Sequence, residues 1–270
     1  MDEFKYLATK NEKYSFEDLC LLAKLLRAEG GCPWDREQTH KSIRKDIIEE
    51  TYEVIEAIDK EDSELMREEL GDLLWQVVFH AELEREEGRA DMSDIVHDIC
   101  SKLVHRHPHV FGSVVAETSE VVLDNWEKIK TEEKQRNTVT SKLQSVPPAL
   151  PALMRAQKIG KRAPFFDFAD AEEVLAKLEE ETNELKAAIS SENKADIDEE
   201  FGDLLFTAVS LARKLGIDAE ESLTKASEKF IRRFSVLEAE VIAEDKDITA
   251  LSMAELDAIW DRIKHSLNNN

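Results

Sequence analysis

The sequence predicts an all-α protein made of a tandem repeat of two helical-bundle units, and three observations support this fold class. Gly and Pro are scarce, with eight and six among 270 residues, a composition that favours helix. Helical periodicity runs through both halves of the chain, and alternating strand patterns are nearly absent. The phrase EELGDLLW at 68–75 returns as EEFGDLLF at 199–206, which indicates an internal repeat.

The repeat has one constant spacing over its most similar part. A shift of 131 residues aligns these two phrases, and the same shift aligns EETYEV at 49–54 with EETNEL at 180–185. Two further pairs align when the shift is changed slightly. KLVHRH at 102–107 resembles KFIRRF at 229–234, and WEKIK at 126–130 resembles WDRIK at 260–264. The chain is therefore interpreted as two copies of a unit of about 120 residues.

A polar stretch that becomes proline-rich separates the two copies. It includes Pro147, Pro148 and Pro151, and such a composition is typical of a linker. The predicted division is an N-terminal unit at 1–135, a linker at 136–150 and a C-terminal unit at 151–270.

Composition also limits the partners that the protein can have. The formal net charge is −23, so neither polymeric nucleic acid nor a membrane surface is an expected partner. A nucleotide is compatible with this charge, because divalent cations bridge carboxylate to phosphate. The start of the chain lacks a signal-peptide pattern, and no apolar run approaches the roughly 18 residues of a membrane span. Three cysteines without CxxC spacing are typical of free thiols in the cytoplasm.

Each copy is predicted to contain a helical hairpin whose inner face carries acids. The expected helices are 42–59 and 63–87 in the first copy, and 171–189 and 195–214 in the second. On a helical wheel Glu50 falls within the apolar stripe and Glu53 lies at its edge. Glu69 likewise falls among the apolar positions of the next helix, with Asp72 near its edge.

The spacing of these acids brings them level across the hairpin. Glu53 lies about six residues before the turn and Glu69 about six after it, so each is about 9 Å from the turn. The four acids of the first copy are therefore expected to converge between the two helices. The second copy repeats the intervals with Glu181, Glu184, Glu200 and Asp203.

Four ionised carboxylates that face a core need counter-charge. Neither apolar stripe shows a Lys or Arg, and all-oxygen ligands suit Mg²⁺, with Mn²⁺ as a possible substitute. Acids spaced three apart are also common on solvated helix faces, but the inward orientation favours a metal site. A di-iron site is disfavoured because it requires Glu-x-x-His, and Asp72 and Asp203 occupy the histidine positions.

The pattern E-E-x-x-E followed by E-x-x-D resembles the MazG family of nucleoside triphosphate pyrophosphohydrolases in its long, two-copy form. The resemblance extends over nearly the whole chain, and three further phrases support it: GGCPWD at 30–35, HRHPHVFG at 105–112 and PALMRAQKIGKR at 151–162. It implies an all-α NTP pyrophosphatase-like fold, and a homodimer or higher homo-oligomer. It also implies Mg²⁺-dependent hydrolysis of NTPs or dNTPs between the α- and β-phosphates, with broad specificity suited to cleaning the nucleotide pool.

The resemblance also assigns roles to residues. It implies that the acids Glu181, Glu184, Glu200 and Asp203 are metal ligands, with Glu50, Glu53, Glu69 and Asp72 as their equivalents. The nucleotide contacts that it implies are Lys177, Lys229, Arg233, Trp260 and Lys264, with Lys130 as a further phosphate contact. A lysine that some relatives place shortly before E-x-x-D is not matched, because Asp196 stands there.

The residues themselves fit this chemistry. Lys229 and Arg233 share a helix face and could stabilise developing charge on pyrophosphate. Glu199 or Glu200 could orient the attacking water as the catalytic carboxylate. Trp260 could stack on a base or belong to the core.

Other features have two interpretations each. The histidines of HRHPHVF, which are His105, His107 and His109, could bind zinc, although a capped turn or a subunit contact is the favoured interpretation. Trp34 in GGCPWD is interpreted as a packing anchor rather than a base platform. The aromatics of APFFDF at 163–168 are open to the same two interpretations.

Two alternative functions remain open from sequence. One is a non-enzymatic acidic helical scaffold that binds metal for stability, and the other is a narrower dNTP or dUTP hydrolase. The fuller row of acids in LEEETNE at 178–184 favours activity in the second copy. The first copy nevertheless keeps its four acids together with Lys102, Arg106, Trp126 and Lys130.

Overall fold

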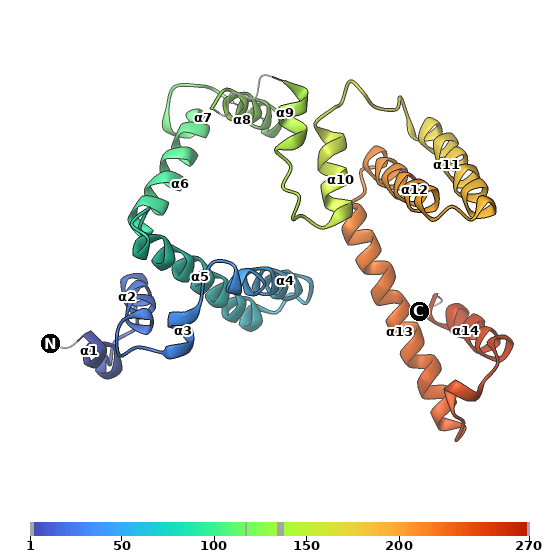
Figure 1. Cartoon of the computed structure of the whole chain (residues 1–270), viewed down its shortest axis with the longest axis horizontal. Helices are drawn as coiled ribbons and strands as arrows, with labels where there is room; N and C mark the ends of the chain where they lie inside the picture. The colour runs from blue at the N-terminus through green and yellow to red at the C-terminus, as the bar shows by residue number, and fades with distance from the viewer. Residues whose placement is uncertain (1–2, 117, 134–137, 269–270) are drawn as a thin grey trace. The chain divides into compact units, whose positions relative to one another are not determined.

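A computed structural model describes residues 3–116, 118–133 and 138–268 (Figure 1). Every regular element in these ranges is a helix, and no strand occurs among them, which confirms the all-α prediction. The chain forms two compact units, residues 1–133 and 134–270. The predicted boundary at residue 135 falls at 134–137, outside the described residues. No described helix is both long enough and apolar enough to cross a membrane.

Unit one is built around the long helix α5. Both α2 and α4 pack against α5, and α6 continues the chain from it. Its elements are α1 (Glu3–Thr9), α2 (Phe16–Arg27), α3 (Pro33–Glu37), η1 (Ser42–Arg44), α4 (Asp46–Asp59), α5 (Ser63–Glu86), α6 (Met92–Arg106), α7 (Pro108–Phe111) and α8 (Ser119–Glu133).

Unit two contains the equivalent hairpin and a long helix that leaves it. α11 pairs with α12, α10 covers α12, and α13 contacts α10 and α12 before α14 packs back onto it. Its elements are α9 (Val139–Gln144), α10 (Ala152–Lys161), α11 (Ala171–Ser191), α12 (Lys194–Lys214), α13 (Ala219–Ala243), η2 (Ile248–Ala250) and α14 (Met253–Asn268).

Part of the stretch that was expected to be a linker is ordered. Within 136–150, α9 begins after Thr138, whose hydroxyl caps the helix by accepting from the Ser141 amide. Arg162, just after α10, donates to the Lys142 carbonyl at 2.6 Å and also bonds the Ser145 hydroxyl. Because the arginine ties the end of α9 to α10, residues 138–150 are attached to unit two.

The two hairpins turn in the same way, and this turn sets the level of the acids. Glu61 and Glu192 occupy matching positions and both have left-handed backbones, with φ of 53° and 58°. The next residues, Asp62 and Asn193, cap α5 and α12 by accepting from backbone amides of the first turn. The left-handed residue ends one helix, and the N-cap residue that follows it begins the next. The helices on either side of each turn pack against each other, α4 against α5 and α11 against α12, which confirms the predicted hairpins.

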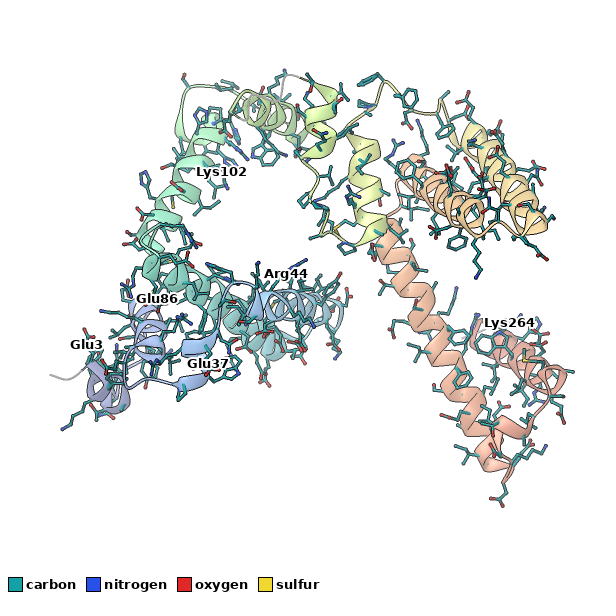
Figure 2. The ribbon with its side chains drawn as sticks, viewed as in Figure 1. Glu3, Glu37, Arg44, Glu86, Lys102 and Lys264 are labelled. Carbon is teal, nitrogen blue, oxygen red and sulfur yellow. The ribbon has the colours of Figure 1, made fainter. Side chains whose placement is uncertain are left out.

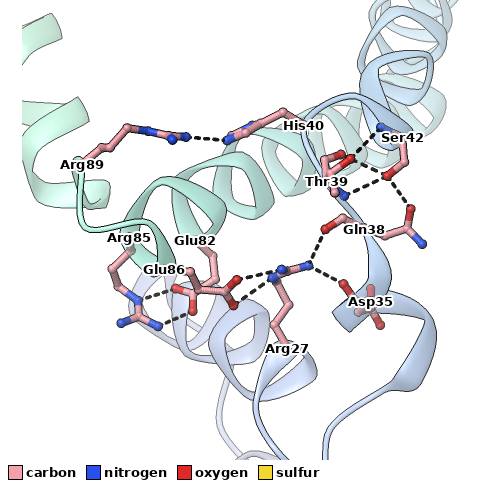
Figure 3. A network of polar contacts seen from close by, with 10 residues as sticks. All are labelled: Arg27, Asp35, Gln38, Thr39, His40, Ser42, Glu82, Arg85, Glu86 and Arg89. Carbon is pink, nitrogen blue, oxygen red and sulfur yellow. Dashed lines mark hydrogen bonds and ion pairs between the residues drawn. The ribbon is translucent and has the colours of Figure 1, made fainter.

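Arg27 clamps the segment that leads into α4 (Figure 3). From α2 its guanidinium donates to the Glu86 carboxylate on α5, at 2.9 and 2.7 Å. It also donates to the backbone carbonyls of Asp35 and Gln38 and lies over the Phe79 ring, 5.4 Å from its centroid. The side chain of Arg27 is only 7% exposed, whereas that of Glu86 is 34% exposed, so the guanidinium is buried and its carboxylate partner reaches the surface.

Replacing Arg27 by Ala should therefore destabilise unit one by about 2 to 3 kcal/mol, because buried carbonyls and a carboxylate lose their donor. Urea unfolding followed by tryptophan fluorescence would measure the loss. The matched control is Arg262→Ala, since Arg262 and its partner Glu240 are 64% and 43% exposed and its loss should change stability by within about 0.5 kcal/mol. Equal effects of the two substitutions would contradict the clamp.

Candidate metal centres and active site

In unit one the acids of α4 and α5 converge as their spacing predicts. Ligand oxygens of Glu50, Glu69 and Asp72 lie within 4.8 Å of one another. Glu69 is buried and only 9% exposed, whereas Glu50 is half-buried and Asp72 is exposed. Glu53 also lies beside this group, since its hydrogen bonds and its negative charge raise the pKa of both Glu50 and Glu69. The cluster thus opens from a buried carboxylate to the solvent.

Proximity and burial make ionisation of this cluster costly. Burial, followed by the charges of Asp72 and Glu53, raises the pKa of Glu50 to about 6. Burial and the charge of Glu53 raise the pKa of Glu69 as well. Glu50 and Glu69 therefore resist ionisation unless a cation joins the group.

Unit two has a similar cluster, but the three carboxylates that lie closest together are not the exact equivalents of those in unit one. Ligand oxygens of Glu181, Glu184 and Glu200 lie within 4.8 Å of one another, with Glu181 buried. Burial comes first among the causes that raise the pKa of Glu200, and the charges of Glu184, Glu181, Asp203 and Glu199 follow. Asp203 and Glu199 are therefore near neighbours of the cluster, and both are exposed.

A lysine neutralises part of the second cluster, contrary to the prediction that the stripe holds no basic residue. On α11 the Lys177 ammonium is 2.7 Å from Glu180 Oε1 and 3.0 Å from Glu181 Oε1. These two carboxylates raise the pKa of Lys177 well above its usual value. The signal was present in the sequence, because Lys177 lies one helical turn before Glu181 and shares its face.

The two clusters differ at this position. The 131-residue shift places Asp46 of unit one where unit two has Lys177. The first copy therefore has an acid at the sequence position where the second has a base. Both clusters offer the all-carboxylate donors that suit a hard divalent cation, so the residues present fit such a metal.

The other residues predicted to contact nucleotide lie on different helices from the acids. Lys229 and Arg233 are on α13, and Trp260 is on α14. Lys264 is also on α14, as Figure 2 shows. Trp260 is half-buried, packs beside the Leu237, Val241 and Ile263 core and lies 5.2 Å from Phe230 between ring centroids. Lys264 forms an ion pair of 2.7 Å with Asp261. Among the described residues α13 meets the hairpin through α12, and the contacts of α14 are with α13.

The equivalent residues of unit one are engaged with one another. Arg106 is buried and binds the Glu133 carboxylate at 2.5 Å. The Trp126 ring has Arg106 Cζ at 5.2 Å and Lys130 Nζ at 4.5 Å from its centroid. These are cation–π distances, so this ring already has two cationic neighbours within its own unit.

The aromatic residues ahead of both hairpins face outward. Trp34 is 60% exposed, so the interpretation of Trp34 as a packing anchor is wrong for the described part of the chain. In APFFDF, Phe165 and Phe166 are also exposed, while Asp167 holds the loop through Arg213 and, at 2.8 Å, Lys214. Neither loop contributes its aromatic side chains to a core cluster.

Comparison with known proteins places this geometry in a family. The model of the MazG nucleotide pyrophosphohydrolase domain matches twice, over residues 38–111 and 169–236. A nucleoside triphosphate pyrophosphohydrolase of Escherichia coli strain K12 is 46% identical over 250 residues, which cover 91% of this chain and 95% of that protein. A nucleoside triphosphate pyrophosphohydrolase/pyrophosphatase MazG of Thermotoga maritima is 41% identical, covering 92% and 95%. The uncharacterized protein YabN of Bacillus subtilis is 40% identical over 95% of this chain, which spans 54% of YabN.

The raised pKa of Glu50 gives a pH dependence with a defined sign. Its carboxyl has an ordinary pKa of 4.5 and a folded value of about 6, so the stability that it contributes is fully present below pH 4.5 and is lost as the pH rises through 6. Divalent cations need the ionised form, so metal-induced stabilisation should weaken as the pH falls below about 6.

Thermal melting with and without Mg²⁺ across this range would measure the effect. Glu50→Gln is the control, and its metal-free stability should vary less with pH between these two values. An identical pH profile in the wild type and the variant would contradict the assignment.

Proposed function

The chain belongs to the MazG family of nucleotide pyrophosphohydrolases, and from this we propose that it hydrolyses nucleoside triphosphates to a nucleoside monophosphate and pyrophosphate. The observation that carries the proposal is the carboxylate cluster of Glu181, Glu184 and Glu200 with the Lys177 ammonium beside it. Acids can hold a divalent cation, and an adjacent base can hold phosphate. The same site therefore has both parts that phosphoryl transfer to water requires.

We propose Mg²⁺ as the metal, with Mn²⁺ as a substitute, held by Glu181, Glu184, Glu200 and Asp203. When bound, Mg²⁺ neutralises the charge of the triphosphate and of the leaving pyrophosphate. The remaining roles belong to side chains. Glu199 or Glu200 orients the water that adds across the bond between the α- and β-phosphates, because these carboxylates adjoin the cluster. The Lys177 ammonium leaves Glu181 for a phosphate oxygen when the carboxylates are engaged by the metal.

Residues beyond the hairpin complete the proposed nucleotide site. Lys229, Arg233 and Lys264 supply positive charge for the pyrophosphate, and Trp260 offers its half-buried ring to the base. Lys130 remains a predicted phosphate contact. The substrates proposed are NTPs and dNTPs with little base selection, which would suit removal of unwanted nucleotides from the pool. A narrower dNTP or dUTP hydrolase is the second candidate.

We propose that unit two performs the reaction. It has Lys177 beside its cluster, where the aligned position of unit one is Asp46, so its cluster has a base that can bind phosphate at a position where unit one has an acid. In unit one, Arg106 is bound by Glu133, and Trp126 has Arg106 and Lys130 as neighbours. Unit one keeps the acids Glu50, Glu53, Glu69 and Asp72 as a second cation site.

The uncovered faces of the hairpins support a homodimer or higher homo-oligomer. Large apolar residues at helical spacing are exposed on α4 and α5, and α12 exposes further ones. They are Ile48, Tyr52, Ile55, Leu70, Leu74, Val77, Phe201 and Leu205. Contiguous apolar faces of this kind mark association sites. Cys20, Cys32 and Cys100 are free thiols, which supports the proposed cytoplasmic location.

Product analysis with purified protein, Mg²⁺ and each NTP or dNTP tests the reaction. Glu184→Gln should lower turnover by at least about a hundredfold, the scale of removing one charge-stabilising group. Glu53→Gln should leave most activity, because Glu53 belongs to unit one. Glu179→Gln is the matched control, since Glu179 is exposed on the same helix as Glu184. Absence of pyrophosphate with every nucleotide would leave the metal-binding scaffold as the function.

Lys177→Ala tests the proposed exchange of partners. Removing this ammonium should raise KM for the nucleotide about tenfold, the worth of one charge-assisted hydrogen bond. It should also tighten Mg²⁺ binding in the absence of nucleotide, because Glu181 loses a competing cation. Isothermal titration and steady-state kinetics would measure the two effects. Lys186→Ala, an exposed lysine on the same helix, should change neither, and weaker Mg²⁺ binding by the Lys177 variant would contradict the exchange.

A further inference from the structure

The HRHPHVF motif of unit one has no part in the proposed reaction. It runs from the last turn of α6 into the short helix α7 and brings His105, His107 and His109 into a few residues of chain. Imidazoles suit zinc-type ions, whereas the acidic clusters suit hard cations. The motif is therefore chemically distinct from the carboxylate sites of both hairpins.

His107 has one ring nitrogen fixed by the backbone. Its Nδ1 lies 2.6 Å from the carbonyl oxygen of Leu103. A carbonyl can only accept, so Nδ1 carries the proton and Nε2 keeps its lone pair. Imidazoles that bind metal are commonly oriented in this way, with the other ring nitrogen donating to a carbonyl. His107 thus presents Nε2 as a ligand atom.

His109 has a buried ring nitrogen that the protein does not satisfy. Its Nδ1 is buried, and no group in the described part of the chain lies within hydrogen-bond reach of it. Its ring centroid is 5.5 Å from that of His107, and the two ring planes are tilted by 49°. Pro108 between them restricts the backbone. Two imidazoles are therefore held close together on a constrained turn, and one of them has a buried ring nitrogen without a protein partner.

His105 needs a change of rotamer to join them, because among the residues that the structure describes the ligand atoms of the three histidines do not all lie within 4.8 Å of one another. Its side chain is 67% exposed, and Nε2 lies 3.8 Å from Glu133 Oε1, a loose contact on a side chain free to change rotamer. The neighbouring Arg106 does not add uncompensated positive charge, because the Glu133 carboxylate binds its guanidinium at 2.5 and 3.0 Å.

We propose that His107 and His109 form the core of a Zn²⁺ site, with His105 as the third ligand. Three neutral imidazoles and an open position are an established coordination for zinc. Bound zinc would join the end of α6 to α7 and stabilise this turn of unit one. The site requires no nucleotide, so it stands apart from the proposed hydrolysis.

Equilibrium dialysis of the full chain against Zn²⁺, with Mg²⁺ in large excess to saturate the carboxylate clusters, tests the site. Wild type should retain one zinc ion per chain, measured by mass spectrometry of the metal. His107→Gln and His109→Ala should lose it. His97→Ala, a change to an exposed histidine of α6, should retain it. His105→Ala should bind zinc at least about tenfold more weakly, because even outer-shell changes cost about that much.

A second measurement guards against variants that misfold. His107→Gln keeps a side chain that can donate to the Leu103 carbonyl, so its metal-free melting temperature should match wild type. Zinc should raise the melting temperature of wild type and of His97→Ala, but not of His107→Gln. Equal zinc content in wild type and the His107 variant, or no zinc in wild type, would overturn the proposal. Unchanged affinity in His105→Ala would remove His105 from the ligand set.

Discussion

The need to neutralise inward-facing carboxylates is the constraint on which both units depend. Each hairpin directs acids from two helices into one place, and each burial raises the pKa of at least one of them. Apolar packing alone cannot satisfy such a group, because ionised oxygens lose water without gaining a partner. We therefore propose that a cation completes each hairpin, which would couple metal binding to the folding of this element.

The backbone of the turn fixes the positions of the acids along the two helices of each hairpin. Glu61 and Glu192 take the left-handed conformation at the same place in each repeat, and a side-chain cap follows each of them. A turn of fixed length keeps acids at equal heights on antiparallel helices, since each residue adds about 1.5 Å along the axis. In unit one, Arg27 fixes the segment before α4 through the carbonyls of Asp35 in α3 and Gln38 just after it, and through the Glu86 carboxylate of α5. The cluster is thus positioned from both ends of α4.

Much of this arrangement was predictable from the sequence because it is local. The wheel positions of Glu50 and Glu69 and the distance of each from the turn follow from helix geometry. The Lys177 pair is also local, because Lys177 lies four residues before Glu181, but the helical-wheel analysis of the two hairpins counted no basic residue in either stripe and so missed it. The Arg27 clamp was not predictable, because it uses backbone carbonyls and a carboxylate 59 residues away. The exposure of Trp34 likewise depends on how α3 is held, which no periodicity reports.

Comparison of the two copies within this one chain separates the demands of folding from those of the proposed catalysis. Both copies keep four acids at the same intervals, although only one has a lysine beside them. If the acids served turnover alone, a copy with Asp46 in place of that lysine would have little reason to keep Glu50 and Glu69 on the inner face of its hairpin, where burial raises the pKa of both. Their presence in unit one fits a cation that completes the hairpin itself. The proposed enzyme function of unit two then adds Lys177, and the predicted nucleotide contacts on α13 and α14, to the carboxylate hairpin that both units share.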